Sequence, residues 1–277
     1  MKLSIITINY NNLEGLKRTY ESVVSQTCQD FEWIIIDGGS TDGSKEFIEE
    51  HQERFAYWCS EPDKGIYNAL NKGIKICSGE YISCMNSGDS FYEKDTLQFL
   101  CSYKGTSDIL YGDSLRLFKD GHTEVDHFPD PVELYTFSYG NICHQAMFVR
   151  TVILKEKGFD ESYKIAADYC RWVEALFNGY TFEYINMFVC KFEMGGLSSA
   201  NIELSELEYE RARKEIFPEA VRLSFDRINK YKEIYEKDYL LQEYLKPLEQ
   251  KSKISRWFTT MVLKILKRIF INKRIGL

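Results

Sequence analysis

The stretch that decides the fold runs from Phe31 to Ser44 and reads FEWIIIDGGSTDGS. Its first six residues form an apolar, β-rich run, which predicts a buried strand. Asp37-Gly38-Gly39 ends that strand, and the pattern beyond Ser44 predicts a helix over 44–53. A strand that passes through a tight turn into a helix is the repeating unit of an α/β sheet.

The same strand-and-helix order continues on both sides of this stretch, which predicts a parallel, doubly wound sheet. Ligands of such sheets bind at the carboxyl ends of the strands. Three polar loops leave those ends here, at 9–12, 37–44 and 86–89. The further predicted strands are 3–8, 55–59 and 81–85, and the further predicted helices are 13–26 and 66–76.

The remainder of the chain is more mixed. Residues 203–250 are charged, helical in pattern and almost free of glycine, so they predict a helical extension. We therefore divide the chain into a sheet domain over 1–200, an extension over 201–250 and a tail over 251–277. The other predicted elements are strands at 109–113, 142–149, 180–185 and 188–192, a hairpin over 115–128 and a helix over 168–178.

Charge is distributed unevenly along the 277 residues. The net charge is −7, which argues against a protein built to hold nucleic acid. Residues 251–277 carry eight basic residues and no acid, so the rest of the chain has a net charge of −15. An acidic body with a basic tail predicts that the tail has a partner of its own.

The tail has an amphipathic pattern over 254–271, with aromatic and aliphatic residues on one face and lysines and arginines on the other. This composition favours a helix that lies in a membrane interface. A helix that packs on the domain, or on a second copy in a homodimer, is the alternative. No run of 18 apolar residues and no signal peptide is present, so we expect a cytoplasmic protein peripheral to the inner face of the membrane.

Eight cysteines are present, but they form no Cys-x-x-Cys pair and no zinc spacing with the four histidines. Several lie inside apolar runs, such as Cys84 in 81–85. The expectation is a set of buried, reduced thiols.

Each polar loop offers a specific chemistry. Asp37 can accept hydrogen bonds from a nucleobase or ribose, and the adjacent glycines let a ligand approach the backbone. Lys64 can meet a diphosphate as a point charge. Asp89 can hold Mg²⁺ or Mn²⁺, which uses one or two carboxylates plus phosphate oxygens. Taken singly, each of these segments can also be a capped turn or helix start without a ligand.

Taken together, these motifs resemble glycosyltransferase family 2, whose members share the GT-A nucleotide-binding fold, and in particular its bacterial polysaccharide subgroup typified by a colanic acid biosynthesis transferase. The resemblance covers 3–100 well and 101–200 more loosely. The fold expected is a central, mostly parallel sheet flanked by helices. The matching stretches are SIIT at 4–7, NLEG at 12–15, FEWI at 31–34, DGGS at 37–40, DKGIY at 63–67, NKGI at 71–74 and NSGD at 86–89.

The resemblance implies a nucleotide-sugar donor and a divalent metal, Mn²⁺ or Mg²⁺. Asp37 is the implied base-binding carboxylate and Asp89 the implied metal ligand. The family commonly reads Asp-x-Asp-Asp where this chain has 86–89, and an acid where it has Gly38. The implied nucleotide contacts are Thr7, Asn9, Tyr10, Asn11, Asp37, Gly39, Ser40, Lys64, Asn71 and Ser87.

The family generally inverts the anomeric centre, which requires a base for the acceptor hydroxyl. It places this acid at a helix start after a Gly-Phe-Asp turn, and Gly158-Phe159-Asp160 precedes Asp168 here. Asp168 is therefore the implied base, with a simple helix cap as the alternative. Asp113, for the donor sugar, and His144 and Gln145, for the acceptor, are further candidates, each with a structural role as the alternative.

The resulting hypothesis is an inverting glycosyltransferase that moves a sugar from a nucleotide-diphosphate sugar, with UDP as the default, to a glycan or lipid-linked acceptor in cell-surface polysaccharide biosynthesis. One alternative is a non-catalytic nucleotide-binding or scaffold subunit with the same fold. A nucleotidyltransferase would need a glycine-rich N-terminal loop followed by arginine and lysine, which 10–13 lacks.

Overall fold

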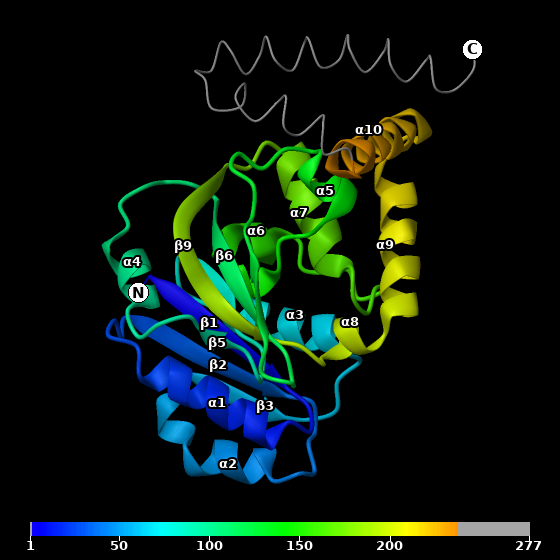
Figure 1. Ribbon diagram of the computed structural model, residues 1–277. Coiled ribbons are helices and arrows are strands. Elements are labelled where there is room, and N and C mark those ends of the chain that lie inside the picture. Colours follow the sequence, from blue (N-terminus) through cyan, green and yellow to red (C-terminus); the bar gives the residue numbers. More distant parts are fainter. Residues whose placement is uncertain (1, 238–277) are drawn as a thin grey trace, which may run out of the picture. The chain divides into compact units, whose positions relative to one another are not determined.

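A single twisted sheet organises the computed structural model, which describes residues 2–237 (Figure 1). The nine strands lie in the order β3-β2-β1-β4-β8-β6-β9-β5, with β7 paired to β6. The first four of these run parallel, and β8 joins β4 antiparallel. The strands in the first half are β1 (Leu3–Asn9), β2 (Phe31–Asp37), β3 (Tyr57–Ser60), β4 (Tyr81–Cys84) and β5 (Ser90–Phe91).

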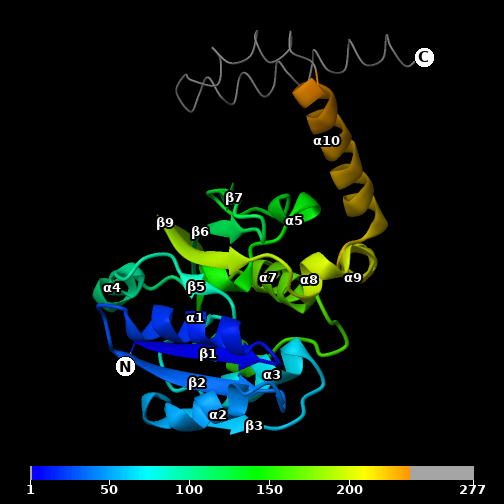
Figure 2. The same cartoon turned by 60° about the horizontal axis from the view of Figure 1, so that its bottom comes forward.

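Helices cover both faces of the parallel half, as Figures 1 and 2 show. Every residue of β1 is buried, as expected for a strand between two helical layers. Ile5 packs in the same core cluster as Leu16 and Ile48, while a Cβ on Gly73 would lie 2.7 Å from Ile6. The helices are α1 (Leu13–Val24), α2 (Ser44–Glu50), α3 (Ile66–Ile76), α4 (Thr96–Ser102) and the 3₁₀ turn η1 (Gln52–Arg54).

The second half of the sheet is mixed, and β6 pairs antiparallel with β7 and β8 but parallel with β9. The predicted hairpin over 115–128 is present. The strands predicted at 180–185 and 188–192 form one strand instead, whose register shifts opposite Asp113. The elements are β6 (Ile109–Leu117), β7 (Thr123–Asp126), α5 (Thr136–Tyr139), the 3₁₀ turn η2 (His144–Ala146), β8 (Met147–Arg150), α6 (Thr151–Glu156), α7 (Ala167–Phe177) and β9 (Phe182–Glu193).

The chain divides into two compact units, Met1–Pro218 and Glu219–Leu277. The first contains α8 (Leu197–Ala200) and α9 (Ile202–Ile216), and the second contains α10 (Glu219–Lys237). The division into 1–200, 201–250 and 251–277 stays a prediction. The amphipathic helix predicted over 254–271 lies outside the described residues. Within residues 2–237, no helix combines the length and apolarity that a membrane span requires.

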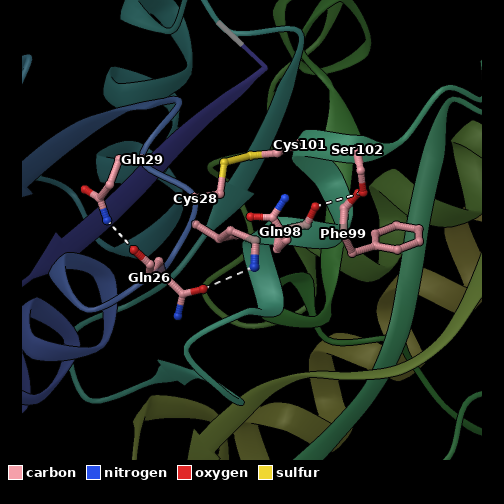
Figure 3. Close-up of a disulfide and its surroundings, with 8 residues drawn as sticks. Gln26, Cys28, Gln29, Gln98, Phe99, Cys101 and Ser102 are labelled. Carbon is pink, nitrogen blue, oxygen red and sulfur yellow. Dashed lines mark hydrogen bonds between the residues drawn. A yellow bond between two sulfur atoms is a disulfide. The ribbon is translucent and has the colours of Figure 1, made fainter.

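One expectation about the cysteines is wrong. A disulfide joins Cys28, just after α1, to Cys101 in α4 (Figure 3). The Gln26 side chain links the same two segments, because it donates to the Glu93 carbonyl and accepts from the Leu97 amide. Sequence spacing could not reveal the pair, since 73 residues separate its members. The other six cysteines are free.

Candidate nucleotide-sugar site

Asp37 organises the loop at the carboxyl end of β2. Its carboxylate accepts from Asn9 Nδ2 (2.7 Å), Ser40 Oγ (2.6 Å), Ser60 Oγ (2.6 Å) and the amides of Ser40 (2.9 Å) and Gly39 (3.2 Å). The side chain is 0% exposed. These bonds fix the ends of β1, β2 and β3 to one another. They also leave no exposed oxygen for a nucleobase, so the predicted base contact of Asp37 does not fit its surroundings.

The loop after β1 is held by Asp37 indirectly, through the Ser40 hydroxyl. Ser40 Oγ accepts from the Asn11 amide (2.7 Å), and the Asn11 side chain accepts from the Thr41 amide (2.8 Å). This arrangement leaves the Tyr10 ring 67% exposed. Thr7 is fully buried and its Oγ1 accepts from Trp33 Nε1 (3.0 Å), so it supports the sheet and offers no group to a nucleotide, contrary to prediction.

The middle of α3 contacts a turn near residue 160. Asn71 Nδ2 donates to the Phe159 carbonyl (2.8 Å) and to Glu161 (2.9 Å), and its Oδ1 accepts from the Phe159 amide (2.9 Å). Asn71 therefore links two segments of the protein, and we withdraw its assignment as a nucleotide contact. Lys64 is exposed and lies two residues before α3 begins. Its contact with a diphosphate stays a prediction.

The 86–89 loop follows β4 and is tied to the loop after β1. Ser87 Oγ donates to the Asn12 carbonyl (3.1 Å), and Asn12 Nδ2 donates to the Ser87 carbonyl (3.0 Å). Asp89 is 5% exposed and accepts from the Glu193 amide (2.9 Å) and from Gln145 Nε2 (2.7 Å). Burial raises its pKa to about 6. Asp89 thereby connects β4 to the end of β9.

The surroundings of Asp89 decide whether a cation fits. Among residues 2–237 no group of three or more His, Cys, Asp or Glu side chains could hold a metal ion. Nevertheless, Asn86 Oδ1 in the same loop is buried and lacks a hydrogen-bond partner. One carboxylate and one amide oxygen, completed by donor phosphate oxygens, match the ligand preference of Mg²⁺ or Mn²⁺.

Asp168 lies in the first turn of α7, after the N-cap residue Ala166, and is 6% exposed. Its Oδ2 accepts from Asn141 Nδ2 (3.1 Å) and from His144 Nδ1 (3.3 Å), and its Oδ1 lies 3.2 Å from the Tyr67 hydroxyl. Burial raises the pKa of Tyr67 well above its usual value, so this hydroxyl stays protonated. Oδ1 also accepts from the Tyr169 amide in the first turn of α7 (2.8 Å). Asp168 therefore satisfies a helix amide in addition to its contacts with three side chains distant in sequence.

His144 and Gln145 link this carboxylate to the 86–89 loop. The Asn86 amide lies 3.0 Å from His144 Nε2, which leaves the imidazole proton on Nδ1, facing Asp168. The next residue, Gln145, donates to Asp89. Because both residues bind carboxylates of the protein, their predicted contact with an acceptor is indirect at most.

Asp113 also has a structural environment. It is 4% exposed, and it accepts from His127 Nδ1 (2.6 Å), the Tyr184 hydroxyl (2.9 Å) and the Phe128 amide (3.1 Å). The side chain therefore joins β6, β9 and the segment after β7. Its oxygens are engaged within the protein, and its contact with the donor sugar stays a prediction.

Sequence reasoning missed Glu208, a buried residue of α9. Its carboxylate accepts from the backbone amides of Lys164 (2.8 Å), Ile165 (2.7 Å) and Ala166 (3.1 Å), which lead into α7. Glu208 therefore fixes the segment that presents Asp168. No local signal could have revealed this role, because the sequence pattern of 203–250 is that of any charged helix and does not distinguish Glu208 from its acidic neighbours.

Replacing Glu208 with glutamine should lower turnover by about 10- to 100-fold, because a displacement of about 1 Å at a reacting group has effects of this size. The KM for the donor should change little, since the proposed nucleotide loops follow β1, β2 and β4, whereas Glu208 lies on α9. Steady-state kinetics of this variant and of Glu206→Gln, an exposed neighbour, provide the comparison. Equal rates for the two variants would show that Glu208 has no positioning role.

The sheet, with polar loops at the carboxyl ends of its parallel strands, has the architecture of the GT-A fold class. The chain belongs to glycosyl transferase family 2, whose family pattern matches residues 4–124. This match spans the three polar loops and confirms the resemblance to family 2.

Relatives and solved structures agree with this assignment. The chain is 37% identical over 175 residues to an uncharacterised glycosyltransferase of Mycobacterium tuberculosis. The aligned region covers 60% of this chain and 65% of that protein. It is 30% identical over 214 residues to a PGL/p-HBAD biosynthesis glycosyltransferase of Mycobacterium bovis, covering 72% and 80%. The chain thus spans just under two thirds of the first relative's length.

Among solved structures, TarS 1-349 of S. aureus in complex with UDP-GlcNAc superposes with a TM-score of 0.62 at 19% identity, covering 81% of this chain and 70% of that one. A mannosyltransferase of Pyrobaculum calidifontis in complex with GDP-Man and Mn²⁺ superposes with a TM-score of 0.56 at 14% identity, covering 97% and 87%. At these identities the likeness concerns the fold, and it confirms the predicted GT-A sheet.

Proposed function

We propose that this protein is an inverting glycosyltransferase that uses a nucleotide-diphosphate sugar. One observation carries the proposal: a hydrogen-bonded series from Asp168 through His144 to Asn86 joins the predicted base to the loop predicted to meet the diphosphate. An acceptor hydroxyl that attacks the anomeric carbon must lose its proton near the site where the diphosphate departs. The connection between Asp168 and the 86–89 loop fits that requirement.

The chemistry follows from the position of Asp168. Its carboxylate takes the acceptor proton while the acceptor oxygen bonds to the anomeric carbon, and the nucleoside diphosphate leaves with the electrons of the broken bond. In-line displacement inverts the anomeric configuration. Asn141 and His144 hold Oδ2, so these side chains orient the carboxylate for proton transfer.

The donor end of the site is formed by the loops after β1, β2 and β4. Tyr10, Asn11 and Ser40 remain candidates for nucleotide contact, and Lys64 is the cation nearest to a diphosphate in this proposal. We take uridine as the first base to test, since TarS is described with UDP-GlcNAc. Asn9, Gly39 and Ser87 contribute by holding the loops in place.

A divalent cation, when bound, would be held by Asp89 and Asn86 Oδ1 and would neutralise the charge that develops on the diphosphate. The protein's own contribution is to keep Asp89 in position through Gln145 and the Glu193 amide. Asp89 is buried and forms no salt bridge within residues 2–237, so a metal ion would supply a counter-charge to its carboxylate.

The acceptor is proposed to be a glycan or a lipid-linked sugar of a cell-surface polysaccharide. The relative from Mycobacterium bovis is named for PGL/p-HBAD biosynthesis, and the basic tail would suit an acceptor at a membrane. Binding of 251–277 to the membrane, or to a second copy of the chain, stays a prediction.

The proposal is tested by incubating the full chain with UDP-, GDP- and dTDP-sugars and extracted lipid-linked acceptors, and by determining the anomeric configuration of the product by NMR. We expect one donor class to give a product of inverted configuration. A product of retained configuration contradicts the mechanism. Nucleotide binding without any transfer or donor hydrolysis would favour the non-catalytic alternative.

Replacing Asp89 with asparagine should remove the metal dependence of nucleotide binding. The variant keeps an oxygen for the Glu193 amide but loses the negative charge that a cation requires. Calorimetric titration of UDP should show an affinity gain with Mn²⁺ in the wild type that falls by about 10-fold or more in this variant. Asp42→Asn, in an exposed turn, is the control, and an unchanged gain in Asp89→Asn rules out Asp89 as a ligand.

A further inference from the structure

Position 38 has an unusual neighbour. Glycine occupies the position after Asp37, and a Cβ built on Gly38 would lie 2.7 Å from Oδ2 of Asp63 and 3.1 Å from Cδ2 of Tyr10. The carboxylate of Asp63 therefore fills the space that a side chain at position 38 would enter. It reaches this space from the loop between β3 and α3.

The two oxygens of Asp63 have different surroundings. Oδ1 accepts from the Gly65 amide (2.8 Å) at the start of α3, which fixes the orientation of the carboxylate. Oδ2 faces Gly38 and, within residues 2–237, accepts no hydrogen bond. The side chain is only partly buried, so a ligand can reach it. Asp37 next to it is fully buried and accepts five hydrogen bonds, and it therefore cannot take this role.

Three features meet around Gly38: an exposed aromatic ring at Tyr10, a backbone without a side chain, and an acceptor oxygen on Asp63. A nucleobase needs a flat apolar surface for its face and a hydrogen-bond partner for its edge. Because a carboxylate only accepts hydrogen bonds, it favours a base edge that carries an N–H group. The ring N–H groups are N3–H of uracil and thymine and N1–H of guanine. Cytosine has no ring N–H at this edge, because its N3 is an acceptor that repels a carboxylate, and its donor there is the amino group on C4.

We infer that Asp63 is the residue that selects the nucleobase, by accepting a hydrogen bond from the base N–H beside Tyr10. This inference rests on the proposed function, because it assumes that a nucleotide occupies the loops after β1 and β2. It predicts that uridine, thymidine or guanosine diphosphate binds better than cytidine diphosphate.

The test uses Asp63→Asn, which keeps Oδ1 for the Gly65 amide and preserves the start of α3. Calorimetry with Mn²⁺ present compares UDP, GDP, dTDP, CDP and N3-methyl-UDP on the wild type, on Asp63→Asn and on Glu61→Gln. Glu61 is a suitable control, since it is an exposed acid two residues away whose carboxylate pairs with Lys72. Equal melting temperatures of the three proteins confirm that the substitutions leave the fold intact.

If wild type favours UDP, we expect it to bind CDP and N3-methyl-UDP at least about 10-fold more weakly, the size of one hydrogen bond to a charged group. Asp63→Asn should bind UDP about 10-fold more weakly and lose most of this discrimination, while Glu61→Gln should resemble the wild type. If GDP or dTDP binds best, the same loss against CDP is expected.

The outcomes separate the two proposals. A wild type that prefers CDP, or an Asp63→Asn variant that keeps full affinity and discrimination, overturns the role of Asp63 and leaves the proposed function in place. A wild type that binds none of the four nucleotides contradicts the proposed function itself, and the selection of a base by Asp63 falls with it.

Discussion

Replacing Asp168 with asparagine is expected to lower the rate of sugar transfer by about 10²- to 10⁴-fold, the contribution typical of a general base. Asparagine has the shape of aspartate and can still contact Asn141 and His144, but it cannot take up the acceptor proton. Affinity for the nucleotide should remain within about twofold, since Asp168 lies on α7 and the nucleotide loops follow β1, β2 and β4.

The comparison for this variant is Asp160→Asn. Asp160 lies in an exposed turn before α7 and accepts from the Ser162 amide (2.9 Å), a bond that asparagine preserves. Rates measured at saturating donor and acceptor separate the chemical step from binding. If Asp168→Asn turns over as fast as Asp160→Asn, another group is the base, and the proposed mechanism is wrong.

The second large effect concerns stability. Replacing Asp37 with alanine should lower the free energy of unfolding by about 3–5 kcal/mol, because buried donors of Asn9, Ser40 and Ser60 lose their acceptor and each costs about 1–3 kcal/mol. The loops after β1 and β2 both depend on these bonds. We therefore expect nucleotide binding to disappear as well, although Asp37 has no exposed oxygen for a ligand.

Urea unfolding of Asp37→Ala and Asp42→Ala measures this difference. Asp42 belongs to the same loop but is exposed, and it accepts from the amides of Leu13 (2.8 Å) and Ser44 (3.1 Å). Loss of such a cap costs about 1 kcal/mol. A loss below about 1 kcal/mol for Asp37→Ala would show that the hydrogen-bond network contributes far less than its burial implies.

The parallel half of the fold was predictable because its signals are local. The run predicted as a strand over 3–8 is β1, Leu3–Asn9, and the helix predicted over 66–76 is α3, Ile66–Ile76. Each boundary depends on neighbouring residues: an apolar run, a turn or a capping side chain. The segment of β9 was predicted as two strands with a break at 186–187. The structure has a single strand that bulges there, and Asn186 adopts a positive φ of 46°.

The loops that form the site were predictable from the sequence. The role of each residue within these loops was less predictable. Sequence motifs single out polar residues such as Asp37, Asp89 and Asp113, but they do not indicate which side-chain oxygens already accept hydrogen bonds within the protein. Glu208 and Tyr67 act on Asp168 and its segment from 40 to 101 residues away. Such partners depend on the folded topology, and no spacing rule within one sequence gives them.

The central claim is that nucleoside diphosphates bind to the loops after β1, β2 and β4. Thermal unfolding with UDP, GDP, dTDP and CDP, each with and without Mn²⁺, tests it most directly, because a ligand of the native state raises the apparent melting temperature. We predict a clear rise with one nucleotide, larger with Mn²⁺ and absent in Asp37→Ala. No rise with any of the four nucleotides, at concentrations up to several millimolar, would contradict the claim.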